Sequence, residues 1–273
     1  MSSLVQRLLT AAALIPVVVW FVMFSNDTAF TFILSVIVFI AASEWAGLSK
    51  LDSKANSYFY AFFVLAISFA MNTLSAPVLY MLMMASLFFW LLITALIISK
   101  PKCLLELSAS RPIMMVLGAM VIGLTFVSLC QVRLEFEQGP DLLMYLLLLI
   151  WTADSGAYFA GRAFGQHKLS PVISPGKSLE GVAGGLLACF VLAFFGAQYF
   201  SVGSSVLFIG MSIFIALISV YGDLFESLMK RRADVKDSGA ILPGHGGILD
   251  RIDSLIAAGP VFLACILITE IFT

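Results

Sequence analysis

Two pairs of carboxylates are the side chains of this sequence best suited to chemistry. Asp223 and Glu226 are three residues apart, and so are Asp250 and Asp253. Side chains with this spacing share one face of a helix, where their oxygens can bind a hard cation such as Mg²⁺. Two simpler roles stay open for these groups: Lys230 can neutralise both Asp223 and Glu226, and Asp250 can simply cap a helix. We expect metal ligation by Asp223 and Asp250, with Glu226 as a further candidate ligand.

A basic run and a glycine-rich turn connect the two pairs. Lys230, Arg231 and Lys236 precede the turn Pro243-Gly-His-Gly-Gly247. Basic side chains bind phosphate, and glycines let backbone N–H groups approach a phosphate closely. The alternative is a basic run that only anchors membrane topology. On its own, His245 is as compatible with a hydrogen bond in the turn as with catalysis.

A second motif, Ser174-Pro-Gly-Lys-Ser178, places a lysine and two hydroxyls before an apolar stretch. It is not a P-loop, because Pro171 stands where the first glycine of that motif belongs. A helix N-terminus with Lys177 still favours an anion, although a lysine that only sets topology would give the same pattern. The candidates for catalysis are Lys177, Lys230, Arg231, Lys236, Asp237, His245, Arg251 and Asp253, and those for substrate binding are Ser174, Ser178, Ser227, Gly246 and Gly247.

The elements that must position these residues are membrane helices. Hydrophobic residues make up 61% of the 273 residues and charged residues 11%, which excludes a soluble domain. A spanning helix needs about 20 apolar residues. We predict an all-α integral membrane protein with about nine transmembrane helices, in two parts, 1–131 and 141–273, with motif loops 162–178 and 230–250. The predicted spans are 8–24, 28–48, 57–75, 77–98, 112–131, 141–163, 179–200, 204–229 and 251–272.

The basic residues predict the orientation of these spans. With nine helices, 14 of the 15 Lys and Arg lie on the side of the N-terminus, and Arg133 lies alone on the other. Positive residues stay inside, so we expect a cytoplasmic N-terminus and an extracytoplasmic C-terminus. Glu44 and Asp154 then lie near the inner ends of their spans. An acidic group within a span is costly and needs a reason, so Asp154 is a candidate for a second cation or for orienting a basic side chain.

The motifs together resemble the signature of the CDP-diacylglycerol synthases, also called phosphatidate cytidylyltransferases. The resemblance covers the 27 residues from Ser227-Leu-Met-Lys-Arg231 through Lys236-Asp237, Leu242-Pro243 and His245-Gly-Gly247 to Asp250-Arg-Ile-Asp253. Asp154-x-x-x-Tyr158 and Ser174–Gly181 are similar to the family's other cytoplasmic motif. The whole resemblance extends over roughly residues 140–260.

This resemblance implies the reaction CTP + phosphatidate → CDP-diacylglycerol + pyrophosphate. It also implies a requirement for Mg²⁺, a potassium ion beside it, and a homodimer in the lipid bilayer, and it matches Asp223 and Asp250 to the family's metal-binding aspartates. The short termini and the lack of a transit peptide favour a bacterial inner membrane, with the active site on the cytoplasmic side.

Other functions remain open on the residues alone. A net charge of −1 gives no indication of nucleic-acid binding. A cation-coupled membrane transporter would use Asp154, Asp223 and Glu226 as a relay, but it leaves the glycine-rich turn unexplained. A CTP-dependent lipid kinase would transfer the γ-phosphate and release CDP. The products formed from CTP distinguish all three functions.

Overall fold

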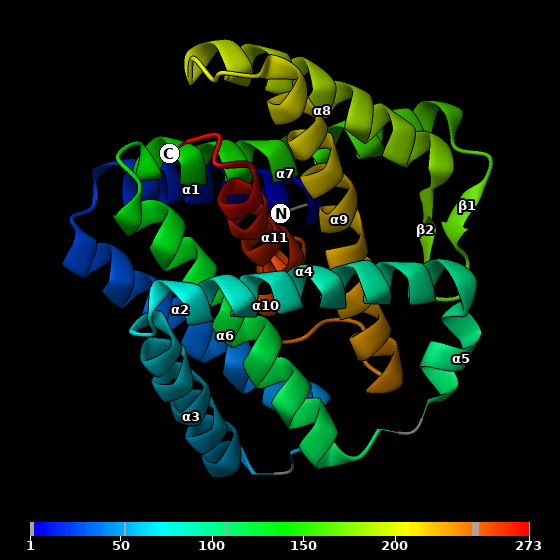
Figure 1. Cartoon of the computed structure of the whole chain (residues 1–273). Coiled ribbons are helices and arrows are strands. Elements are labelled where there is room, and N and C mark those ends of the chain that lie inside the picture. The colour runs from blue at the N-terminus through cyan, green and yellow to red at the C-terminus, as the bar shows by residue number, and fades with distance from the viewer. Residues whose placement is uncertain (1–2, 52, 108, 242–245, 273) are drawn as a thin grey trace.

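The protein is a bundle of membrane helices with almost no sheet (Figure 1). The computed structural model describes residues 3–51, 53–107, 109–241 and 246–272, with side chains from residue 14 onward. In this described part, eight segments are long and apolar enough to cross a membrane. They are α2 (Asp27–Leu48), α3 (Lys54–Asn72), α4 (Ala76–Ser99), α6 (Arg111–Glu135), α7 (Gly139–Phe164), α8 (Leu179–Tyr199), α9 (Ser205–Arg232) and Leu249–Thr269. The chain is therefore an all-α integral membrane protein.

The first predicted span coincides with α1 (Ser3–Phe24), of which Leu14–Phe24 is described as a shorter apolar helix. The last predicted span is divided into α10 (Leu249–Ile252) and α11 (Leu255–Thr269). Between them, the Asp253 carboxylate accepts the Ser254 N–H at 2.7 Å and so competes with the helical hydrogen bonds. The break places Asp253 at the junction of the two helices.

Two further elements lie in segments that the sequence predicts as loops. Helix α5 (Pro101–Glu106) is one short helix that begins with a proline, and six residues are too few to show a helical period. Strands β1 (Lys168–Ser170) and β2 (Ser174–Ser178) form an antiparallel hairpin. Their sequences, Lys-Leu-Ser and Ser-Pro-Gly-Lys-Ser, are rich in residues that are uncommon in strands, so composition indicates a loop there.

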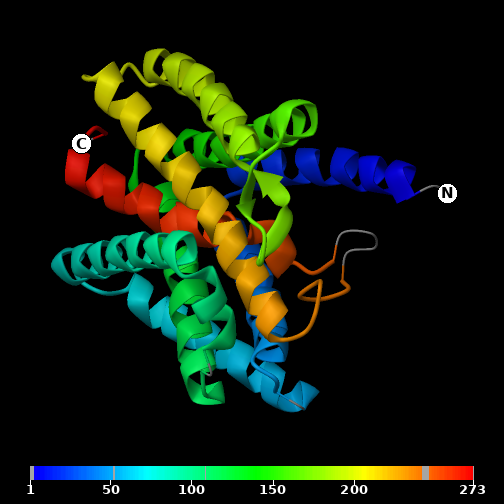
Figure 2. The same cartoon turned by 90° about the vertical axis from the view of Figure 1, so that its right-hand side faces the viewer.

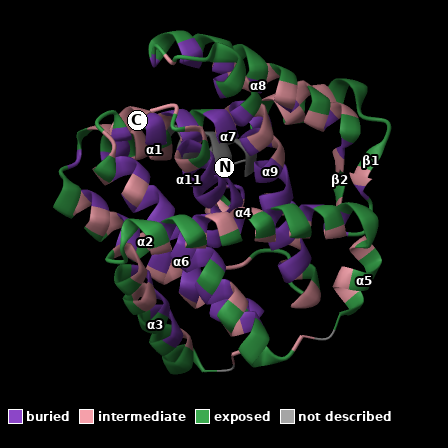
Figure 3. Ribbon diagram, in the orientation of Figure 1, coloured by how far each residue is buried: buried purple, intermediate pink, exposed green. Residues whose placement is uncertain are grey.

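Helix α11 lies at the centre and packs against α4, α6, α7 and α9. Its residues from Ile256 to Ile266 are buried. Figure 3 shows the opposite for α3, α4 and α8, whose outer faces are largely exposed. Those faces carry large apolar side chains such as Phe59 and Phe88, as expected for helices that face lipid.

The connections between helices gather at two ends of the bundle. At one end Lys50 lies 3.9 Å from Asp234, and Arg232 donates to the Leu107 carbonyl at 2.6 Å. Figure 2 shows the bundle from the side, with the β1–β2 hairpin and the segment after α9 on the same side of it. We call this end the motif end, defined by α5, the hairpin and residues 233–241. The opposite end carries the connections before α2 and before α7.

At that opposite end Arg133 is buried and closes the C-terminus of α1. It donates to the Val22 and Ser25 carbonyls at 2.9 and 3.0 Å and lies 3.7 Å from Asp27. This position of Arg133 agrees with the predicted distribution of basic residues, in which Arg133 lies alone on one side of the membrane. Which end faces the cytoplasm stays a prediction.

Helices α7 and α8 approach each other closely through small residues. A Cβ on Gly185 would lie 2.6 Å from the Ala153 carbonyl oxygen, and one on Gly184 would overlap the Ala160 Cβ. Small residues permit such approach between membrane helices. The contact fixes the part of α7 that carries Asp154 against α8 and the hairpin that precedes it.

Candidate active site

The first of two charged clusters forms around Lys177. Strand β2 delivers this lysine to α9, where its Nζ lies 2.7 Å from Asp223 Oδ2 and donates to the Val220 carbonyl at 3.3 Å. Asp223 Oδ1 accepts the Ser227 hydroxyl at 3.2 Å. Both members of the ion pair are about a quarter exposed. The predicted phosphate-binding lysine and the predicted metal-binding aspartate are therefore in direct contact.

Two further carboxylates and an arginine belong to this cluster. Asp253 interacts electrostatically with Asp223, Asp154 and Lys177, and Asp154 interacts also with Arg251. Gly222 makes this possible, because a Cβ there would lie 2.8 Å from the Ala257 Cβ and 2.9 Å from the Asp253 carbonyl oxygen. Residues from α7, β2, α9 and the α10–α11 junction thus meet at the motif end.

The second cluster forms about two helical turns further along α9, around Lys230. Its Nζ contacts Glu226 and lies 2.6 Å from Asp250 Oδ1. The Glu226 side chain is fully buried, and the Lys230 ammonium is the charged partner of its carboxylate. Glu226 also interacts electrostatically with both Asp250 and Asp253, so the two clusters are contiguous.

Asp250 orders the segment that precedes it. Its Oδ2 accepts the Ser238 N–H and hydroxyl, both at 2.9 Å, and the Gly247 N–H at 2.7 Å. Gly246 has φ +79°, and a Cβ there would lie 2.5 Å from Asp250 Oδ2. Glycine is required at position 246 both by its backbone conformation and by the approach of this carboxylate. The last two glycines of the glycine-rich turn, Gly246 and Gly247, therefore lie directly against Asp250.

The hairpin that carries Lys177 is fixed at its base. The Glu180 carboxylate accepts the backbone N–H groups of Gln166 and His167 and lies 2.6 Å from His167 Nδ1. Ser178 is buried and caps α8 by accepting the Gly181 N–H at 3.1 Å. Ser174 is half-buried and pairs with Ser170. These contacts give Ser178 a structural role beside its predicted role in substrate binding.

The remaining predicted residues include exposed charged side chains and a buried glycine. Arg231, Lys236, Asp237 and Arg251 are exposed at the motif end, where a soluble substrate can reach them. His245 lies outside the described residues. Gly247 is buried, and its N–H is bonded to Asp250.

Two residues of the clusters were absent from the predicted site. Glu44 reaches the second cluster from α2, and Ser238 joins it from the loop after α9. Glu44 could have been found, because an acidic residue inside a predicted span needs a partner or a function. Nothing in the local sequence indicates that its partners lie about 200 residues away.

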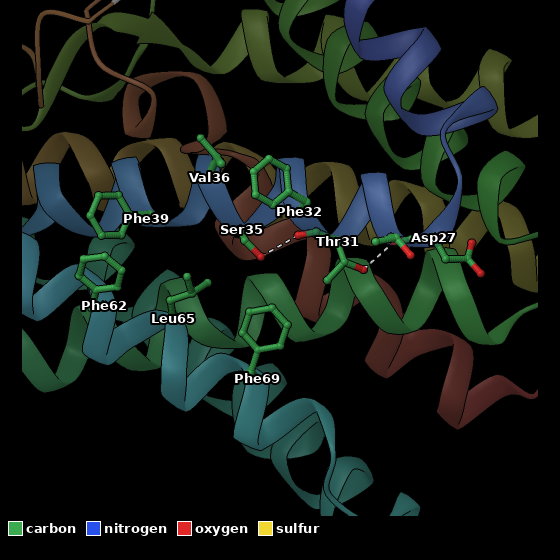
Figure 4. A pocket seen from close by; sticks show the side chains of 10 residues that line it. Asp27, Thr31, Phe32, Ser35, Val36, Phe39, Phe62, Leu65 and Phe69 are labelled. Atoms are coloured by element: carbon green, nitrogen blue, oxygen red, sulfur yellow. Dashed lines mark hydrogen bonds between the residues drawn. The ribbon is translucent and has the colours of Figure 1, made fainter.

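A cavity of about 750 Å³ lies apart from both clusters, between α2 and α3 (Figure 4). Phenylalanines dominate its lining, and its hydroxyls on Thr31 and Ser35 donate to carbonyls of their own helix at 2.8 and 2.7 Å. None of the predicted site residues lines it. The chemistry therefore belongs to the charged clusters and not to this apolar cavity.

Comparison with known proteins identifies the family. Residues 5–269 match the model of the cytidylyltransferase family. The chain belongs to this family. Phosphatidate cytidylyltransferase of Haemophilus influenzae is 38% identical over 94% of this chain and 96% of its own length. That of Pseudomonas aeruginosa is 35% identical over 95% of each, and that of Bacillus subtilis is 42% identical over 53% of this chain and 54% of its own.

Family membership makes the chain a nucleotidyltransferase enzyme. The match extends from the first helix to the last, well beyond the roughly 140–260 that the motifs cover. These relatives give no support to a cation-coupled transporter or to a CTP-dependent lipid kinase.

Proposed function

We propose that the chain is a phosphatidate cytidylyltransferase, which transfers the cytidylyl group of CTP to phosphatidate and yields CDP-diacylglycerol and pyrophosphate for phospholipid biosynthesis. The observation that carries this proposal is the similarity over 94% of the chain to a relative of that name. The matched residues include every member of both charged clusters. The clusters are suited to phosphate chemistry because lysines and carboxylates stand side by side in them.

The reaction needs no covalent enzyme intermediate. A phosphate oxygen of phosphatidate attacks the α-phosphorus of CTP, and the bond from that phosphorus to the pyrophosphate oxygen breaks. The phosphatidate dianion is already nucleophilic, so the enzyme has to position two anions and neutralise their charge. Lys177 and Lys230 supply ammonium groups that the carboxylates hold in place, and each would exchange its aspartate for a phosphate oxygen when substrate enters. Arg231, Lys236 and Arg251 are the exposed candidates for the outer phosphates.

The charges of the clusters suit Mg²⁺. Glu226 and Asp250 share one ammonium, so a cation would offset an excess of carboxylate. Asp223 and Asp250 would hold Mg²⁺, with Asp154 and Glu226 as further ligands and a potassium ion alongside. In the described part no three acidic, histidine or cysteine side chains form a closed metal site. Mg²⁺ usually takes one or two carboxylates plus substrate phosphates and water, and when bound it neutralises phosphate charge.

We propose further that the motif end faces the cytoplasm, in a bacterial inner membrane, and that the enzyme is a homodimer. The basic residues support the orientation, because 14 of 15 belong to the predicted inner side. A cytoplasmic site suits the substrates, since CTP is soluble there and phosphatidate lies in the membrane. The dimer rests on the family resemblance alone.

The test of the reaction is the fate of each phosphate of CTP. Purified protein is incubated with phosphatidate, Mg²⁺ and CTP labelled either at the α- or at the γ-phosphate. A cytidylyltransferase puts the α-label into lipid and the γ-label into pyrophosphate. Transfer of the γ-label to lipid with release of CDP would indicate a lipid kinase. Ion flux across sealed vesicles without consumption of CTP would indicate a transporter, and either result would refute the proposal.

A further inference from the structure

Glu44 is a buried carboxylate on α2. It contacts the loop between α9 and α10, which carries part of the second cluster. The residue is 7% exposed. Oε1 accepts the Ile248 N–H at 3.1 Å, and Oε2 accepts the Leu249 N–H at 2.8 Å. Helix α10 has no side-chain cap of its own, so Glu44 satisfies the free N–H groups at its start from a distant part of the chain.

The loop is shaped to admit this carboxylate. A Cβ on Gly247 would lie 2.5 Å from the carboxyl oxygens of Glu44, and a Cβ on Gly239 would overlap the same group. Gly239 precedes the glycine-rich turn, and Gly247 is its last residue. Their lack of a side chain leaves the space that the Glu44 carboxyl group fills.

The contact is linked directly to Asp250. Three consecutive N–H groups, from Gly247 to Leu249, donate to carboxylates: the first to Asp250 and the next two to Glu44. Ser238 lies between the two acids, with its hydroxyl 2.9 Å from Asp250 Oδ2 and 3.3 Å from Glu44 Oε2. A shift of residues 247–249 would therefore move Asp250 relative to Lys230.

We propose that Glu44 is a positioning residue of the active site, which holds Ser238 and residues 247–249 so that Asp250 stays aligned with Lys230. The inference rests on the proposed function and adds to it a contribution from the first half of the chain. Glu44 acts through the loop and does not touch the reacting groups.

Both carboxyl oxygens are needed for this role. Glutamine has the same shape, but it offers one acceptor oxygen and an NH₂ donor. In a Glu44→Gln variant the NH₂ group would face the N–H of either Ile248 or Leu249. Two facing donors repel, so the loop should loosen while α2 keeps its packing.

The experiment compares Glu44→Gln with Glu106→Gln, a matched control on α5 that is exposed at the same end of the protein. Hydrogen exchange of the peptide covering 246–252 is measured first, because it needs neither substrate nor metal. Turnover of CTP and phosphatidate is measured second. For Glu44→Gln we expect faster exchange and a kcat lowered about 10- to 100-fold, the size of effect that a misplaced group produces. The KM for CTP should stay within about twofold, because a positioning defect acts on the chemical step.

The outcomes separate this inference from the proposed function. A wild-type protein that makes no CDP-diacylglycerol refutes the function, while the exchange measurement still tests the anchor. Unchanged exchange in Glu44→Gln, or faster exchange with normal turnover, overturns the positioning role. If Glu44→Gln does not fold, Gly239→Ala disturbs the same contact from the loop and should lower kcat in the same way; normal kcat there overturns the role. Failure of both variants to accumulate beside a normal Glu106→Gln would make the contact a folding requirement and would equally refute the proposal.

Discussion

Lys177 and Lys230 each hold an aspartate that the family resemblance assigns to metal binding. The Nζ–Oδ distances are 2.7 Å to Asp223 and 2.6 Å to Asp250. Such pairing keeps four charged groups close together before substrate arrives and avoids an unpaired charge at the membrane interface. The types and spacing of these four residues in the sequence predict them as site residues, and the structure places them in two ion pairs. The sequence could not pair them, because each contact joins segments about 20 to 46 residues apart.

Replacing Lys177 with alanine tests whether this lysine acts in the site or only in topology. Lys177→Ala removes the ammonium beside Asp223, so we expect kcat/KM for CTP to fall by about 10²- to 10³-fold, as when one charge-stabilising donor is lost. Steady-state kinetics in detergent micelles provides the measurement. Lys102→Ala is the matched control, because Lys102 is exposed on α5 at the same end. Equal activities of the two variants would reduce Lys177 to a topological anchor.

At the scale of elements, the apolar stretches predicted the spanning helices to within a few residues of their observed ends. Length and hydropathy decide such helices locally, since each must satisfy its own backbone within the bilayer. The hairpin and the break between α10 and α11 depend instead on contacts with other segments. Glu180 ties the hairpin to α8, and Gly222 lets α9 approach the junction at Asp253. No local pattern in the sequence predicts either contact.

The close contact between α7 and α8, here called the seam, leads to a prediction about stability. Gly185→Ala places a methyl group against the Ala153 carbonyl oxygen, so we expect destabilisation by roughly 1–3 kcal/mol. Thermal unfolding of the purified protein in detergent measures the effect. Gly210→Ala in α9 is the control: a Cβ there meets no atom within 4 Å, and better helix propensity should raise stability by about 0.5–1 kcal/mol. A Gly185→Ala variant as stable as Gly210→Ala would show that the seam is not tightly packed.

At the scale of the whole molecule, the site combines both halves of the chain. Its lysines and aspartates come from residues 141–273, whereas Glu44 belongs to the predicted N-terminal part, 1–131. Hydrophobic periodicity marks which segments span the membrane but not which neighbours they choose. For this reason the predicted division at 131–141 describes the order of helices along the chain better than it describes the assembly of the site.

The orientation of this assembly can be tested with a cysteine that the protein already has. Cys103 on α5 is exposed at the motif end, whereas Cys130, Cys189 and Cys265 are buried. If the motif end is cytoplasmic, a membrane-impermeant maleimide should label Cys103 in inverted membrane vesicles and leave it unlabelled in intact spheroplasts. The measurement is the mass shift of the purified protein after each treatment.

The converse reporter makes this test decisive. Glu137 is exposed in the connection between α6 and α7, at the opposite end. In a Cys103→Ser background, Glu137→Cys should therefore react in spheroplasts and not in inverted vesicles. The two patterns must be opposite, because an odd number of spans separates the two positions in the predicted topology. Labelling of Cys103 from outside would put the charged clusters on the side without CTP. CTP would then have to cross the membrane to reach the clusters, and both the orientation and the proposed route of the substrates would be wrong.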